Sequence, residues 1–146
     1  MIKKIFYILF LISLFTPVIA LEKTKEEKVA KFVLENMQKD YTSCYGFYKI
    51  ASESFKNANA DKSIVNGLDK SADLTLKFTH DLGEVLNYKL KSMSENNKKE
   101  IKKLNIIAKK DFNKLSKKYG MLCKKLVEDQ KQRIDYWENE GNKKIK

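Results

Sequence analysis

The sequence predicts an all-α protein, an antiparallel three-helix bundle of long amphipathic helices that follows a removable export signal. From residue 29 onward, apolar residues recur at steps of three and four, the spacing of one face of an α-helix. Polar and apolar residues do not alternate for long anywhere, so the pattern gives no support for strands. Residues 21–146 also contain no proline, the residue that most strongly interrupts helices.

Residues 1–20 have the three-part layout of a secretory signal peptide. Lys3 and Lys4 give a positive leader, and residues 5–15 form an apolar run of eleven that ends before Pro17. The residues just before the expected cleavage point are small or apolar. This run is shorter than the about 20 residues that cross a bilayer, so we expect cleavage, with an uncleaved anchor as the alternative.

Cleavage would leave an exported protein, periplasmic in a Gram-negative cell and secreted otherwise, with no transmembrane span. Its length fits one domain. We expect residues 21–140 to form a single helical bundle and residues 141–146 to be a frayed basic tail.

The first helix is expected to begin after Thr24, because Thr24 and Glu27 have the spacing of a capping box. Its apolar stripe ends at the polar link formed by residues 57–61. The stripe consists of Val29, Phe32, Val33, Met37, Tyr41, Cys44, Phe47, Tyr48, Ala51 and Phe55.

A second stripe predicts a helix that reaches residue 93, with residues 94–97 as the next turn. Gly67 lies inside this helix and should weaken it by about 1 kcal/mol relative to alanine. The stripe consists of Ile64, Leu68, Ala72, Phe78, Leu82, Val85, Leu86, Leu90 and Met93.

The third stripe has alternating steps of three and four, which are typical of helices packed at shallow angles. The pattern decays after Leu126, because Gln130 and Arg133 occupy core positions, and Gly141 is the expected stop. The stripe consists of Ile101, Leu104, Ala108, Phe112, Leu115, Tyr119, Leu122, Cys123 and Leu126. No internal sequence repeat is evident, so a solenoid is not expected.

Cys44 and Cys123 are the only cysteines, and both lie on apolar stripes. In an exported protein an even number of cysteines favours a disulfide. The first and third helices of the predicted bundle run in the same direction, and the two cysteines fall at similar heights along them. We therefore expect Cys44 and Cys123 to be bonded, with Cα atoms within about 7 Å.

The formal net charge is +11, and it becomes +9 once the two lysines of the signal are removed. This balance favours anionic partners such as lipid headgroups, cell-wall polymers or acidic proteins. Nearly all of the cations are lysine, with Arg133 the single arginine, so specific nucleic-acid recognition is not expected. A genome rich in A and T would give the same lysine content without any binding role.

The third predicted helix carries most of this charge and suggests one candidate surface. A helix with one apolar and one basic face can lie on an anionic membrane, although such a face is also the ordinary solvated back of a core helix. The candidate contacts are Lys109, Lys110, Lys117, Lys118, Lys124 and Lys125.

Aromatic residues suggest a second candidate, a face for a protein partner, since interfaces favour tyrosine and tryptophan. Tyr41, Tyr45 and Tyr48 lie close together around Cys44, and they could equally form a core thickened around a disulfide. Tyr136 and Trp137 lie beyond the well-patterned part of the third helix, where they could instead cover the end of the bundle.

No pattern in the sequence points to catalysis. His80, the single histidine, falls on the polar side of its helix, and the cysteines occupy core positions that disfavour a reactive thiolate. We expect no metal site and no cofactor. The predicted function is non-enzymatic binding of a protein or an anionic envelope surface, with an enzyme of unknown class as the alternative.

Overall fold

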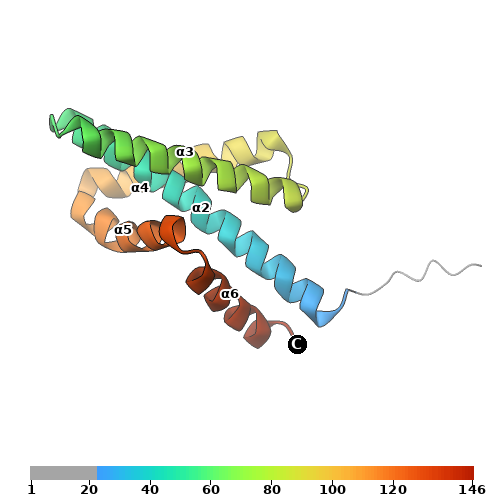
Figure 1. Ribbon diagram of the computed structural model, residues 1–146. Coiled ribbons are helices and arrows are strands. Elements are labelled where there is room, and N and C mark those ends of the chain that lie inside the picture. Colours follow the sequence, from blue (N-terminus) through green and yellow to red (C-terminus); the bar gives the residue numbers. More distant parts are fainter. Residues whose placement is uncertain (1–22) are drawn as a thin grey trace, which may run out of the picture.

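The computed structural model describes residues 23–146, and the expected signal peptide lies outside the described residues. Within residues 23–146 all regular structure is helical, which confirms the predicted fold class. The helices are α2 (Lys25–Asn57), α3 (Lys62–Val85), α4 (Leu90–Lys110), α5 (Phe112–Glu128) and α6 (Lys131–Lys144) (Figure 1).

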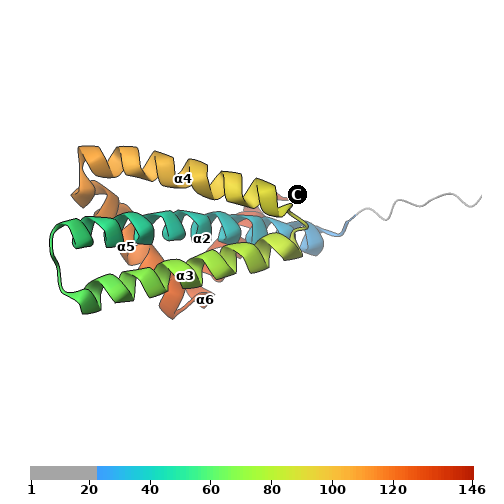
Figure 2. The same cartoon turned by 90° about the horizontal axis from the view of Figure 1, so that it is seen from above.

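Helix α2 lies at the centre, and each of the other four packs against it (Figure 2). It begins as the sequence predicts. The Glu27 amide donates to Thr24 Oγ1 at 3.2 Å, and the Thr24 amide donates to Glu27 Oε2 at 3.1 Å, which completes a capping box. Most of its predicted stripe is buried, and Phe55 at the far end is 37% exposed.

The turns are made by asparagines in the left-handed region. Asn59 has φ 53° and Asn87 has φ 59°, a conformation that asparagine tolerates better than most residues. Helix α2 therefore ends at the predicted link. The next turn lies at residues 86–89 instead of residues 94–97, which belong to α4. The absence of apolar residues at 94–97 was the wrong signal, since the chain turns at Asn87, which has positive φ.

Helix α3 returns along α2 through a face of small and polar residues. Ala72, Thr75 and Thr79 are fully buried, whereas Ile64 and Val85, both predicted to be in the core, are 48% and 64% exposed. The buried threonine hydroxyls are satisfied within α3 itself, since each donates to a carbonyl one turn earlier. Leu90, also predicted in the core, is 64% exposed at the start of α4.

The predicted third helix is wrong as a single element, because the chain breaks twice. Asp111 and Asp129 are both extended, with φ of −163° and −148°. The Lys114 amide donates to the Asp111 carboxylate at 3.0 Å, and the Lys131 amide donates to the Asp129 carboxylate at the same distance. Each aspartate ends one helix and satisfies the amides of the next.

The break at Asp111 reverses the chain, so α4 runs parallel to α2 and α5 runs antiparallel to it (Figures 1 and 2). Along α5, Phe112 meets Phe55 and Tyr119 meets Phe47, so residue numbers fall along α2 as they rise along α5. The described range is thus a central helix with four helices around it, not three long helices.

Helix α6 continues through Gly141, which was expected to end it. This glycine is buried against α2, and a Cβ there would lie 3.1 Å from both Val29 and Phe32. The missing side chain allows the close approach of the two helices. Residues 141–144 therefore belong to α6 instead of a frayed tail.

Candidate functional site

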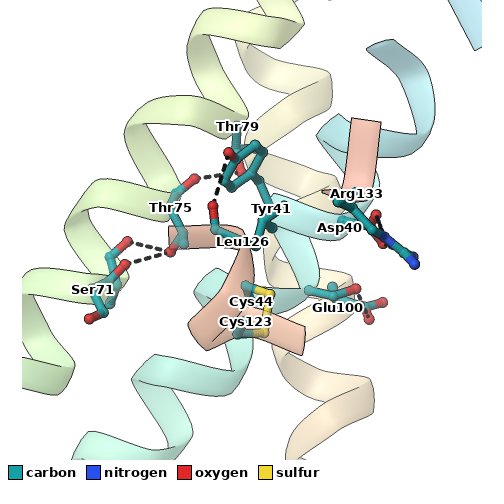
Figure 3. The surroundings of a disulfide bond; sticks show 12 residues. Asp40, Tyr41, Cys44, Ser71, Thr75, Thr79, Glu100, Cys123, Leu126 and Arg133 are labelled. Atoms are coloured by element: carbon teal, nitrogen blue, oxygen red, sulfur yellow. Dashed lines mark hydrogen bonds and ion pairs between the residues drawn. A yellow bond between two sulfur atoms is a disulfide. The ribbon is translucent and has the colours of Figure 1, made fainter. Parts of the chain in front are cut away.

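The two cysteines are brought together in the centre of the molecule (Figure 3). The sulfur atoms of Cys44 and Cys123 lie at bonding distance, 2.03 Å, and the Cα atoms are 5.3 Å apart. Both residues are fully buried. The pairing is the predicted one, but it joins antiparallel helices. The expectation that the cysteines lie on parallel helices is wrong, because α5 starts only after the reversal at Asp111.

Most of the predicted aromatic face is core. Tyr41 and Tyr48 are 1% and 7% exposed, and Tyr45 is half-buried against the same core, so this group presents little surface to a partner. Burial raises the pKa of Tyr41 to about 12, and the neighbouring Asp40 carboxylate adds to the shift. Burial likewise raises the pKa of Tyr48, with a smaller contribution from the charge of Glu128.

The other two aromatic candidates lie on α6 around an ion pair. Arg133 donates to the Asp40 carboxylate through Nε at 2.7 Å and Nη2 at 3.1 Å, and Trp137 Nε1 donates to it at 2.6 Å. The Arg133 guanidinium lies 4.6 Å from the ring centroids of both Tyr136 and Trp137. Tyr136 remains 47% exposed. This cluster attaches α6 to α2, and an arginine at a core position was the sequence signal for it.

A groove of about 260 Å³ lies beside this cluster, lined by Leu122, Lys125, Asp129, Gln132, Arg133 and Tyr136. Lys125 Nζ donates to Gln132 Oε1 at 3.3 Å across it. Arg133 uses Nε and Nη2 to bind Asp40, so the guanidinium is oriented towards α2 by this pair.

All six predicted lysines are exposed, but they belong to two helices that meet at Asp111. Lys109 and Lys110 end α4, and the other four lie on α5. Among the described residues, only one of the six lysines has a carboxylate within 4.0 Å. This is Lys124, whose Nζ lies 3.9 Å from the Glu128 carboxylate. Lys118 lies over the ring of Tyr119, with Nζ 5.1 Å from the centroid.

A short repeat relates these two helices. Residues 102–110 read KKLNIIAKK and residues 117–125 read KKYGMLCKK, with pairs of lysines at the same positions, fifteen residues apart. Several equivalent residues share the same environment. Leu104 and Tyr119 are buried, whereas Ile106 and Met121 are 52% and 64% exposed. Reading the whole segment as one helix concealed this repeat, because the break at Asp111 sets each copy on its own helix.

The two copies meet at a groove of about 220 Å³ between α4 and α5. The groove is lined by lysines from both helices. Lys110 lies on α4, and Lys114 and Lys118 lie on α5. Lys103 lies nearby and donates to the Glu100 carboxylate at 3.0 Å, which raises its pKa. The remaining lining residues are Ile107, Asp111, Leu115 and Tyr119.

Other polar contacts join helices in pairs. Ser52 donates to Asp69 at 2.6 Å, and Lys56 donates to the same carboxylate at 2.9 Å. These two hydrogen bonds lower the pKa of Asp69, the one from Ser52 more strongly. Ser43 of α2 donates to Glu100 of α4 at 2.9 Å. Such contacts fix the helices against one another.

The part of the chain that the structure describes holds no group of three or more His, Cys, Asp or Glu side chains placed to bind a metal ion. His80 is half-buried. Among residues 23–146, no helix combines the length and the apolar character that crossing a bilayer requires. No protein-family model, curated protein or solved structure matches this chain.

Proposed function

We propose that this chain is a small exported, non-enzymatic helical protein that acts by binding another macromolecule, and that this macromolecule presents an anionic surface. One observation carries the proposal. Residues 102–125 contain nine lysines and a single acidic residue, Asp111, a net charge of +8 over the facing parts of α4 and α5.

The charged groups elsewhere in the described range support this assignment by contrast. Arg133 with Asp40 and Lys56 with Asp69 form close pairs that connect helices. The Asp111 carboxylate accepts the Lys114 amide, so the one acid of the basic segment serves as a helix cap. The lysines around it are exposed, and among the described residues only Lys103, paired with Glu100, and Lys124, near Glu128, lie within 4.0 Å of a carboxylate.

The expected binding free energy is that of a weak, reversible attachment. A lysine near an anionic leaflet contributes about 1 kcal/mol. Four to six such contacts at once give about 4 to 6 kcal/mol, which corresponds to dissociation constants of about 1 mM to 40 μM. Because exposed charges are screened within about 8 Å at physiological ionic strength, this attachment should weaken as salt rises.

Two measurements test the proposal. Mass spectrometry of the exported protein should give Leu21 as the amino terminus; retention of Met1 in the membrane fraction would contradict export. The exported protein should bind an anionic resin and anionic vesicles in a salt-dependent manner. The quadruple variant K109Q/K110Q/K124Q/K125Q should bind both far more weakly, whereas the control K62Q/K70Q/K77Q on α3 should bind nearly as well as the unaltered protein.

A second candidate is a protein partner at the turn between α3 and α4. Val85 and Leu90 are each 64% exposed there, and Tyr88 is 37% exposed. Exposed apolar side chains this close together favour a contact with another protein. Capture of a partner from the envelope fraction, lost in V85S/L90S and kept in the lysine variant, would favour this candidate over the first.

A further inference from the structure

We infer that Ile106 and Met121 are membrane anchors, two apolar side chains that insert into an anionic lipid bilayer while the lysines around them bind its headgroups. The inference rests on the proposed function and goes beyond it. Charge alone would suit any anionic surface, whereas exposed apolar side chains within the charge suit a surface with hydrocarbon beneath it.

Each anchor stands at the centre of a ring of four lysines. On a helix, side chains three and four residues away on either side are the nearest neighbours. The ring around Ile106 consists of Lys102, Lys103, Lys109 and Lys110. The ring around Met121 consists of Lys117, Lys118, Lys124 and Lys125. All eight lysines are exposed.

The anchors lie opposite the buried side of their helices. Leu104 and Cys123 are fully buried against α2, and the exposed Ile106 and Met121 are each two residues away, on the far side of the helix. The same arrangement occurs on both copies of the repeat. Two exposed apolar residues, each flanked by lysines on the outer face of its helix, are placed to contact a surface that is both anionic and apolar.

Lysine is suited to this geometry. Its alkyl stem can lie along apolar surface while the ammonium group reaches the phosphates of the headgroups. A polyanion such as nucleic acid offers phosphates without a hydrocarbon layer, and the anchors would remain in water. A bilayer offers phosphates to the lysines of each ring and hydrocarbon to the apolar side chain at its centre.

The fold limits how deep the contact can be. The buried faces of α4 and α5 are committed to the core around Leu104 and Leu115. Only the two anchor side chains and the lysine stems can enter, which corresponds to the headgroup boundary occupied by interfacial helices. The two rings meet at one point, where Lys110 from one and Lys118 from the other line the same groove.

The test measures binding of the exported protein to phosphatidylcholine vesicles with and without phosphatidylglycerol, by flotation at about 0.15 M salt. We expect binding only with phosphatidylglycerol. The variant I106S/M121S keeps every charge and should bind about tenfold more weakly, since it loses the apolar area that would be buried. I106L/M121L should bind like the unaltered protein.

The matched control is I64S/L74S, which removes two exposed apolar side chains, at 48% and 37% exposure, from α3. It should bind vesicles within about twofold of the unaltered protein. All of these positions are exposed, and unchanged thermal melting will show that each variant is folded.

The outcomes separate the two proposals. If I106S/M121S binds vesicles as well as the unaltered protein, Ile106 and Met121 are not membrane anchors. The proposal of attachment by charge alone then stands. If the protein binds an anionic resin or an acidic protein but no vesicle, the bilayer is the wrong partner. If it binds no anionic surface, the proposed function fails as well.

Discussion

Arg133 of α6 and Asp40 of α2 form a bidentate ion pair, with N–O distances of 2.7 and 3.1 Å, between residues 93 positions apart in the sequence. Trp137 donates to the same carboxylate. Apart from Gly141, which is buried, and Trp137, which packs against the core, helix α6 is largely exposed. This pair is therefore the main polar attachment of α6 to the central helix.

Replacing Asp40 with alanine should detach α6. The change leaves the Arg133 guanidinium and the Trp137 N–H half-buried without their acceptor, which should cost about 2 to 3 kcal/mol of unfolding free energy. Amide hydrogen exchange should accelerate across residues 131–144 before the rest of the chain. The control K131A removes an exposed pair with Asp135 on the same helix and should change little. Equal effects of the two variants would argue against a special role for Asp40.

Reduction of the disulfide should destabilise the protein strongly. Cys44 and Cys123 are 79 residues apart, and loop-closure entropy for such a span corresponds to about 4 to 5 kcal/mol. The melting temperature should fall by about 10 °C or more on addition of a reductant. C44A/C123A should melt low with or without reductant. Two free thiols in the protein purified without reductant, titrated after unfolding without reduction, would contradict the bond.

Two glycines of α3 should respond to alanine in opposite directions. At Gly83 an added Cβ would lie 1.9 Å from Sδ of Met93, a residue that is 1% exposed, so G83A should cost about 1 to 3 kcal/mol. At Gly67 an added Cβ meets nothing within 4 Å, and α3 continues through it. G67A should therefore stabilise the protein by up to about 1 kcal/mol. Urea denaturation measures whether the free energy of unfolding falls in G83A and rises in G67A.

Stability at high pH should depend on Tyr41. Its pKa is raised to about 12 in the folded protein, from 10.0, chiefly by burial. The neutral phenol is therefore favoured by folding, and its contribution is complete below pH 10 and is lost as pH rises towards 12. A shift of this size corresponds to about 2 to 3 kcal/mol.

The variant Y41F isolates this contribution. The Tyr41 hydroxyl lies 3.5 Å from the Leu126 carbonyl oxygen, a long contact, so its removal should cost little at pH 7. Between pH 10 and 12 the variant should lose less unfolding free energy than the unaltered protein. Parallel stability curves across this range would show that Tyr41 is not the residue responsible.

The local features of the fold could be predicted because neighbouring residues encode them. The capping box at Thr24, the stripe along α2 and the link after Asn57 depend on helical periodicity and on hydrogen bonds within a few residues. Cys44 and Cys123 could be paired from their number and apolar positions. The lysine repeat was also present in the sequence, but its meaning depends on which residues are exposed.

The direction of the helices and the choice of buried faces were decided by tertiary packing. A single extended residue at Asp111 reverses the chain, and its local signal is only one aspartate among lysines. Packing of α3 on α2 favours small residues such as Thr75 over the larger Ile64, because close approach of two helices excludes bulk. Local periodicity determines that a helix forms and which residues share a face. Contacts between residues far apart determine where that helix lies, and so which of its faces, like that of Met121, remains exposed.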